Sequence, residues 1–167
     1  MARAEKTELI NWHIERWLSK KPNTAHRREV GLLTAVPIPK RRVEGRYREK
    51  PFDRRADFLA WECWPGKLDV WTIVEVKSCL DDFRSDQKWR HYLQFCNKLY
   101  FAVLEDFPIE KINGFDFGIV VCPAQRKYPN ARIVKRAKPS PTSELVDMNR
   151  MKFLLARRKI GQEAYEY

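Results

Sequence analysis

The segment RRADFLAWECWPGKLDVWTIVEVKS, residues 54–78, decides the fold because it predicts a β-hairpin with an unusually charged open end. Two apolar, β-rich runs flank the sequence PGK at residues 65–67, which is a typical turn sequence. If Gly66 is the centre of the turn, residues equidistant from it face each other across the two strands. This register pairs Leu59 with Ile73 and Trp61 with Trp71.

The same register gathers three charged residues at the open end of the hairpin. Asp57 lies opposite Glu75, and Lys77 shares the face of Glu75 because strand side chains alternate. A slip of one residue would send Asp57 to the other face. Two directly opposed carboxylates repel each other. Either Lys77 forms an ordinary exposed salt bridge here, or a divalent cation such as Mg²⁺ joins the carboxylates and supports phosphodiester hydrolysis. The residues alone leave both interpretations open.

A longer pattern extends from this hairpin. Residues 54–103 contain RRAD, VEVKS, DFR-x-D-x-KW and Y-x-x-FCN-x-x-YFAV in that order. Together these sequences resemble the MmcB-like DNA repair proteins of the PD-(D/E)XK nuclease superfamily. The resemblance implies an α/β fold with a restriction-endonuclease-like core, in which helices flank a mixed β-sheet. It also implies a bound Mg²⁺ or Mn²⁺ ion.

The resemblance assigns roles to individual residues. Asp57, Glu75 and Lys77 match the catalytic motif, and the two carboxylates with the backbone carbonyl of Val76 would hold the metal. A glutamate on the first helix often assists in this superfamily, and Glu5 and Glu8 are both candidates because periodicity does not choose between them. The residues that would border the cleft are Asp82, Asp86 and Lys88.

The charge of the chain predicts a polyanionic partner. The formal net charge is +11, and residues 40–55 contain eight Lys or Arg side chains. Such a field attracts nucleic acid, which makes DNA the expected partner and leaves RNA open. Each basic cluster taken singly also fits an ordinary solvated surface. The residues predicted to contact phosphates are Arg41, Arg42, Arg46, Arg48, Arg54 and Arg55.

The rest of the chain completes a single domain over residues 1–167. Scattered cysteines without metal-ligand spacing, no apolar run long enough to span a bilayer and no secretory signal at the start predict a cytoplasmic protein without a membrane partner. Cys96 and the Trp61–Trp71 pair are expected in the core. We expect helices at 4–20, 80–96 and 144–158, a basic loop insertion at 37–53, and further strands at 28–36, 98–104, 117–122 and 131–135.

Three functional hypotheses follow. The first is a metal-dependent nuclease that hydrolyses DNA in repair or recombination. The second is a catalytically inactive nucleic-acid-binding module that retains the nuclease fold. The third is a basic adaptor protein that holds no metal.

Overall fold

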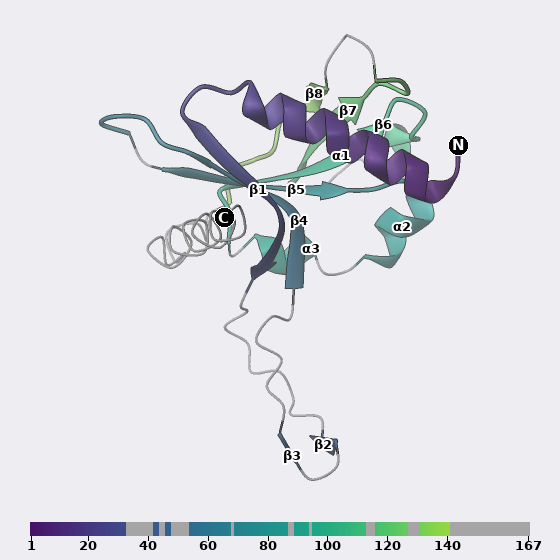
Figure 1. Ribbon diagram of the computed structural model, residues 1–167, viewed down its shortest axis with the longest axis horizontal. Coiled ribbons are helices and arrows are strands. Elements are labelled where there is room, and N and C mark those ends of the chain that lie inside the picture. Colours follow the sequence, from purple (N-terminus) through teal and green to yellow (C-terminus); the bar gives the residue numbers. More distant parts are fainter. Residues whose placement is uncertain are drawn as a thin grey trace, which may run out of the picture.

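The computed structural model describes residues 1–32, 42–43, 46–47, 54–67, 69–86, 89–93, 95–112, 116–126 and 131–140. The predicted helix at 144–158 and most of the predicted insertion at 37–53 lie outside these residues. Two short strands from the insertion are described, β2 (Arg42–Val43) and β3 (Arg46–Tyr47), which pair with each other as a separate antiparallel ribbon (Figure 1).

A six-stranded mixed sheet forms the centre of the protein, with strand order β1-β4-β5-β6-β7-β8 (Figure 1). The pairs β1–β4, β4–β5 and β7–β8 are antiparallel, whereas β5–β6 and β6–β7 are parallel. This arrangement confirms the predicted α/β class and mixed sheet. The strands are β1 (Thr24–Leu32), β4 (Arg54–Glu62), β5 (Val70–Val76), β6 (Lys98–Leu104), β7 (Gly118–Cys122) and β8 (Arg132–Lys135).

The predicted hairpin is β4–β5, and its register is confirmed. Leu59 pairs with Ile73, and Trp61 pairs with Trp71. The two indole rings stack with their centroids 5.7 Å apart. Gly66 has a φ of 73°, a left-handed conformation that glycine adopts without steric cost, so it suits the turn. The charged open end of the hairpin is therefore placed as the sequence predicts.

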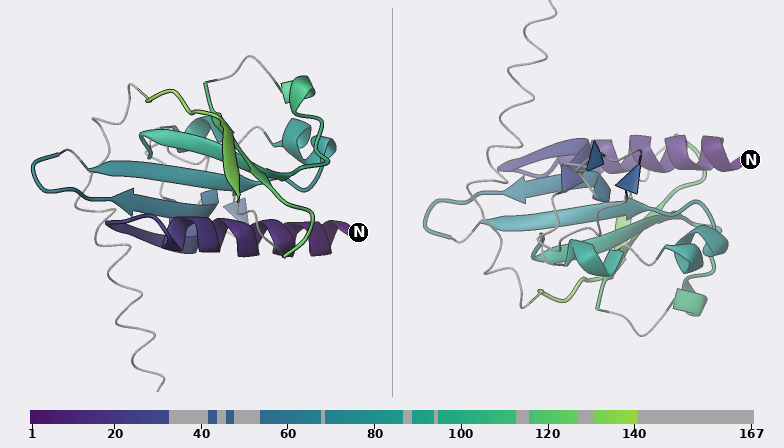
Figure 2. Two further views of the ribbon diagram at one scale, coloured as in Figure 1. Left: turned by 90° about the horizontal axis from the view of Figure 1, so that it is seen from above. Right: turned by 90° about the horizontal axis from the view of Figure 1, so that it is seen from below.

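Helices cover both faces of the sheet (Figure 2). The first helix, α1 (Arg3–Ser19), lies along one face and fully buries Ile10, Ile14 and Leu18 there. The short helices α2 (Leu80–Ser85) and α3 (Trp89–Tyr92) cover the opposite face, and the 3-10 helix η1 (Ile109–Ile112) adds Ile112 to the same core. The sheet thus separates two hydrophobic cores.

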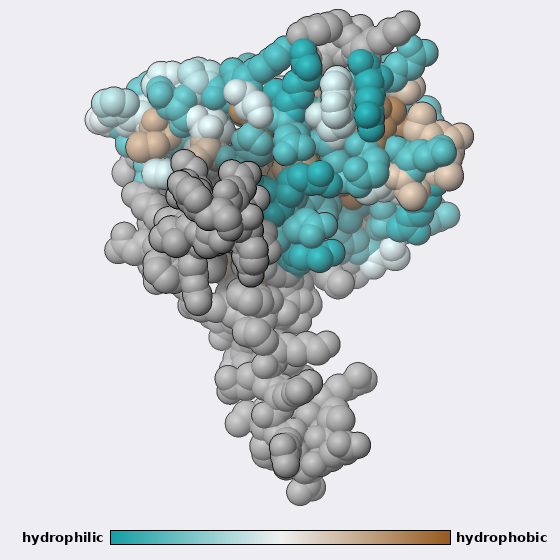
Figure 3. Space-filling model, in the orientation of Figure 1, coloured by the Kyte–Doolittle hydropathy of each residue, from teal (hydrophilic) through white to brown (hydrophobic). Residues whose placement is uncertain are grey.

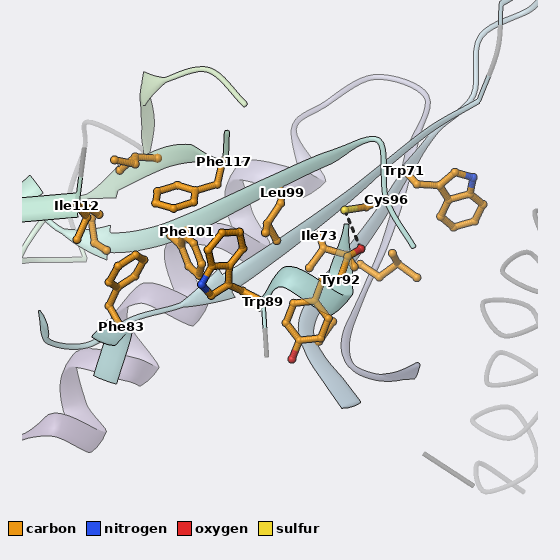
Figure 4. Close-up of a cluster of buried hydrophobic side chains, with 14 of the residues drawn as sticks. Trp71, Ile73, Phe83, Trp89, Tyr92, Cys96, Leu99, Phe101, Ile112 and Phe117 are labelled. Carbon is orange, nitrogen blue, oxygen red and sulfur yellow. Dashed lines mark hydrogen bonds between the residues drawn. The ribbon is translucent and has the colours of Figure 1, made fainter. Parts of the chain in front are cut away.

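An aromatic cluster anchors α2 and α3 to the sheet (Figure 4). Phe83 of α2 and Trp89 of α3 both pack edge-to-face against Phe101 of β6, with ring centroids 5.0 and 6.0 Å apart. Phe117 joins the same cluster, 4.6 Å from Phe101. Cys96 is also buried in this core, as predicted, and burial raises the pKa of its thiol to about 12. The cluster fixes the chain that follows β5, which carries several candidate site residues.

Two predicted elements differ from the structure. The single helix expected at 80–96 is wrong: α2 ends at Ser85 and α3 begins at Trp89. Asp86 caps α2 with an extended backbone, ψ 100°, and its carboxylate pairs with the buried Lys77, so this residue leaves the helix at the point where it meets that lysine. The strand expected at 28–36 begins earlier, at Thr24, because β1 pairs with β4 from that residue onward. Residues 33–36 lie outside the described ranges.

The described part of one face of the protein is largely polar. Hydrophilic residues dominate the described part of the face in Figure 3. In the part of the chain that the structure describes, no helix has the length and apolar character needed to cross a membrane.

Candidate functional site

The open end of the β4–β5 hairpin lines a polar cleft of about 380 Å³. Asp57 from β4 and Glu75 from β5 both line it, together with Val76 and Lys77. The first half of α1, the middle of β1 and the start of α2 form its remaining walls. The residues that these walls contribute are Arg3, Thr7, Glu8, Asn11, Arg28, Glu29 and Asp82, with Arg55 from β4.

Two carboxylates replace the backbone hydrogen bonds at the end of the hairpin. The regular pairing of β4 with β5 stops at Phe58 and Val74. Beyond that pair, the amide of Asp57 donates to Glu75 Oε1 at 3.0 Å, and the amide of Val76 donates to Asp57 Oδ2 at 2.8 Å. Each carboxylate thus reaches across to the other strand, which brings both acids into one cleft as the sequence predicts.

Lys77 is buried beside these acids. Its side chain is 6% exposed, and its Nζ lies 2.6 Å from Asp86 Oδ2 and 3.9 Å from Glu75 Oε2. A buried ammonium group requires such partners, because its desolvation costs several kcal/mol. The ammonium also lies 5.8 Å from the ring of Phe101. The structure therefore holds the lysine in a fixed position rather than in solvent.

The pKa values of Asp57 and Glu75 indicate that a positively charged ligand would stabilise the ionised form of both acids. Burial, and then repulsion from Asp57, raise the pKa of Glu75 to about 8. Burial also raises the pKa of Asp57. Without a cation, ionisation of both acids in the cleft is unfavourable, and Lys77 offsets only part of this free-energy cost. A divalent cation between them would remove that cost.

The donor set fits a hard cation better than a zinc ion. Within the described ranges, no group of three or more His, Cys, Asp and Glu side chains is arranged to hold a metal. Mg²⁺ uses one or two carboxylates and fills its remaining positions with carbonyl oxygens, waters and phosphate oxygens. Asp57, Glu75 and the carbonyl of Val76 match that pattern, so the residues present fit the predicted Mg²⁺ or Mn²⁺.

The structure separates the two glutamates of the first helix. Glu8 lines the cleft, whereas Glu5 does not. The Glu5 carboxylate instead accepts a hydrogen bond from the amide of Ala2 at 2.9 Å, at the start of α1. The Glu8 carboxylate lies 3.3 Å from Asn11 Nδ2 and 3.8 Å from Arg28. Of the two candidates, Glu8 is therefore the one that lies in the cleft.

The predicted cleft-bordering residues have different positions. Asp82 lines the cleft and forms a 2.8 Å ion pair with Arg3 of α1, which joins α2 to the first helix. Asp86 does not line the cleft, but its carboxylate forms an ion pair with Lys77, which does line it. Lys88 lies outside the described residues.

Of the predicted phosphate-binding arginines, the structure places Arg55 in the cleft, 3.6 Å from Glu29. Arg54 belongs to β4, Arg42 to β2 and Arg46 to β3, and their side chains are outside the description. Arg41 and Arg48 lie outside the described residues altogether.

Sequence reasoning missed the wall that α1 and β1 contribute. Arg28 was noticeable as part of a basic pair with Arg27, but its distance in sequence from the hairpin hid its position. Glu29 gave no signal. It has a φ of 52°, uncommon outside glycine, and it interrupts the β1–β4 pairing opposite Asp57. The irregularity therefore adjoins one of the two carboxylates.

The fold and the cleft define an α/β protein with a carboxylate and lysine site at the end of a central hairpin. The chain belongs to the MmcB-like family, because the family model described as DNA repair protein MmcB-like matches residues 50–155. That range contains Asp57, Glu75 and Lys77. Family membership supports a role in DNA repair.

A solved structure supports the fold. A protein of unknown function from Silicibacter pomeroyi is 20% identical, with a TM-score of 0.58 over 99% of this chain and 93% of that one. At this identity the likeness concerns the fold alone. A search of curated proteins finds no match.

Proposed function

We propose that this protein is a metal-dependent nuclease of the PD-(D/E)XK type, with a restriction-endonuclease-like core, that hydrolyses DNA phosphodiester bonds in repair or recombination. One observation carries the proposal: the half-buried carboxylate of Asp57, the buried carboxylate of Glu75 and the buried ammonium of Lys77 share one cleft at the end of a central hairpin. Membership of a family named for DNA repair supports the choice of substrate.

One group of residues binds the cation, and Lys77 stabilises the charge on the phosphate. Asp57, Glu75 and the carbonyl of Val76 hold Mg²⁺ or Mn²⁺, and Glu8 assists from the opposite wall. The bound cation supplies an activated water and a Lewis acid for a phosphate oxygen. Lys77, fixed by Asp86, places a positive charge where negative charge develops on the phosphate during hydrolysis.

The basic side chains around the cleft bind the DNA backbone. Arg3, Arg28 and Arg55 line the cleft, and residues 40–54 of the sequence supply five further arginines. Phosphate contacts of this kind carry no sequence information, so binding is largely independent of DNA sequence. Affinity falls steeply with salt because each contact releases counterions.

A second candidate function is a nucleic-acid-binding module that no longer cuts. It is favoured by the hydrogen bonds that the carboxylates already make: Glu75 accepts from the amide of Asp57, and Asp57 accepts from the amide of Val76. These bonds give both acids a structural task that needs no cation. The module would bind DNA with the same salt dependence and leave it intact.

A cleavage panel tests the proposal. Linear, nicked, branched and single-stranded DNA, with matched RNA, are incubated with the protein in Mg²⁺, Mn²⁺ or EDTA. We expect cleavage of DNA in either metal, its loss in EDTA, and a loss of roughly a hundredfold or more in Glu75→Gln and in Lys77→Met with DNA binding retained. Glu110→Gln is the matched control, because this exposed acid lies on η1 and does not line the cleft.

The other outcomes identify the alternatives. Tight, salt-sensitive binding without cleavage in any metal supports the inactive module and contradicts the nuclease. A protein that neither binds DNA nor gains thermal stability from Mn²⁺ matches the adaptor hypothesis. Cleavage that survives in Glu75→Gln would show that the active site lies elsewhere.

A further inference from the structure

A second cavity lies at the other end of the central strands. It has a volume of about 550 Å³ and shares no lining residue with the cleft around Asp57 and Glu75. Thr72 and Lys98, which pair across β5 and β6, belong to its wall. Thr72 precedes Val76 by four residues, or roughly 13 Å along the strand. The cavity is therefore a separate site on the same sheet.

The cavity carries an excess of positive charge. Three cations line it, Lys21, Lys98 and Arg136, against one acid, Glu62. Lys21 is compensated, because its Nζ lies 3.2 Å from Glu62 and 4.3 Å from the centre of the Trp17 ring. Neither Lys98 nor Arg136 has an ion-pair partner among the described residues. Two positive charges are thus left for a ligand.

The remaining lining is apolar and aromatic. Ile133 and Val134 of β8 are 41% and 40% exposed, which makes them two of the few large apolar residues at the described surface. Tyr100, an aromatic residue of β6, lines the same cavity. A ligand that covers these side chains removes apolar surface from water and is stabilised by it. The ligand must therefore combine an anionic group with an apolar or planar one.

Thr72 adds a polar group to the wall of the cavity. Its side chain is 1% exposed, and its hydroxyl has no hydrogen-bond partner among the residues that the structure describes. Buried hydroxyl groups are nearly always hydrogen-bonded, so an unpaired one next to a cavity requires a reason. A polar group bound in the cavity would supply this partner once the hydroxyl turns toward it about χ1.

We infer that this cavity binds a nucleoside monophosphate, either as a free nucleotide or as the phosphorylated end of a strand. A phosphomonoester carries a charge of about −1.5 to −2 at pH 7, which matches the two uncompensated cations Lys98 and Arg136. The nucleoside packs against Tyr100, Ile133 and Val134. The volume lies within the range of about 300 to 1,000 Å³ of small-molecule sites. The inference does not depend on the nuclease site, because the two clefts have separate residues.

Calorimetric titration in EDTA tests the inference. The probes are dAMP, deoxyadenosine and inorganic phosphate. We expect dAMP to bind, and deoxyadenosine and inorganic phosphate each to bind at least about tenfold more weakly, because each lacks one half of the ligand. Equal affinity for dAMP and deoxyadenosine, or no binding of dAMP, would overturn the inference.

Charge-matched variants locate the binding. The double variant Lys98→Gln with Arg136→Gln should weaken dAMP binding at least about tenfold. The control, Arg132→Gln with Lys138→Gln, removes the same net charge from residues of β8 and its C-terminal extension that do not line the cavity, and should bind as the wild type does. If both double variants lose dAMP affinity equally, the loss is due to net charge, and the proposed binding site is contradicted.

Two further experiments ask whether the phosphate comes from a strand end or a free nucleotide, and whether the site is independent of the cleft around Glu75. An oligonucleotide with a 5′-phosphate should compete with dAMP better than the unphosphorylated strand if strand ends are bound, and the two strands should compete equally if only free nucleotides are. Both results are consistent with a phosphomonoester site in this cavity, provided that the Lys98→Gln, Arg136→Gln variant loses dAMP binding. Glu75→Gln should bind dAMP unchanged, so failure of the nuclease proposal leaves this result intact, and loss of dAMP binding in Glu75→Gln would place the ligand in the other cleft.

Discussion

Replacing Glu75 with glutamine should make the metal-free protein more stable at alkaline pH. Glu75 is 4% exposed, and burial together with the charge of Asp57 raises its pKa from 4.5 to about 8. The folded chain therefore keeps a proton on Glu75 that the unfolded chain releases above pH 4.5. The stability that this group contributes is complete below the unfolded pKa and is lost as the pH rises through the folded one. Glutamine has the same size and stays neutral, so the variant avoids the loss.

The size of the effect follows from the two pKa values. Between them, each pH unit lowers the free energy of unfolding by up to about 1.4 kcal/mol. From about pH 5.5 to about pH 8 the wild type should lose up to ~3 kcal/mol relative to Glu75→Gln. With a urea dependence of about 1 to 3 kcal/mol per molar, this loss moves the unfolding midpoint by roughly 1 M or more.

Urea unfolding in EDTA at these two pH values measures the difference. The wild type, Glu75→Gln and the control Glu110→Gln are compared, and the control should follow the wild type because Glu110 is exposed. Mn²⁺ at about a hundred times its dissociation constant should then stabilise the wild type at pH 8 by ~2.7 kcal/mol, and Glu75→Gln by less. If Glu75→Gln shows the same pH dependence as the wild type, or is the less stable protein at pH 8, the reasoning about this carboxylate is refuted.

Two further substitutions test the packing around the two clefts. Asp86→Asn should cost about 2 to 4 kcal/mol of unfolding free energy, because it leaves the ammonium of Lys77 buried with a weaker partner, whereas Asp116→Asn, at an exposed ion pair, should cost less than about 1 kcal/mol in the same thermal melts. Gly118→Ala should cost about 1 to 3 kcal/mol by urea unfolding, because the added methyl group collides with the ring of Tyr100 and with the backbone nitrogen of Ala137. A Tyr100→Leu background should recover part of that loss, and an equal loss in both backgrounds would point to another cause.

The hairpin was predictable because its information is local. One glycine between two β-rich runs sets the turn, and period-two alternation then assigns every side chain to a face, which places Glu75 and Lys77 together. The break between α2 and α3 was not predictable in this way. The apolar spacing of residues 89, 93 and 96 extends backward through Asp86 as a helical stripe, and nothing local shows that Asp86 leaves the helix to neutralise Lys77. That ion pair depends on a strand and a helix meeting in space.

Only the part of the candidate site that lies on the β4–β5 hairpin was predictable from the sequence. The choice between Glu5 and Glu8 depends on how α1 is rotated on the sheet, which helical periodicity leaves open when apolar residues are not confined to one stripe. Arg28 and Glu29 enter the cleft because β1 pairs with β4 from the other side. Sheet neighbours that are distant in sequence leave no local signal, so this wall of the cleft required the structure.

Strand order explains why residues so far apart in sequence meet at this cleft. Because β4 is antiparallel to β5, the start of β4 lies beside the end of β5, which brings Asp57 to Glu75. Because β6 is parallel to β5, the chain must cross over before it re-enters the sheet. That crossover begins directly after Lys77 and carries Asp82 and Asp86 back past the same strand end. In open α/β sheets, ligands bind beyond the carboxyl ends of the strands. Topology therefore explains where the cleft lies, and the adjacent carboxylates of Asp57 and Glu75 are the reason to expect a positively charged ligand there.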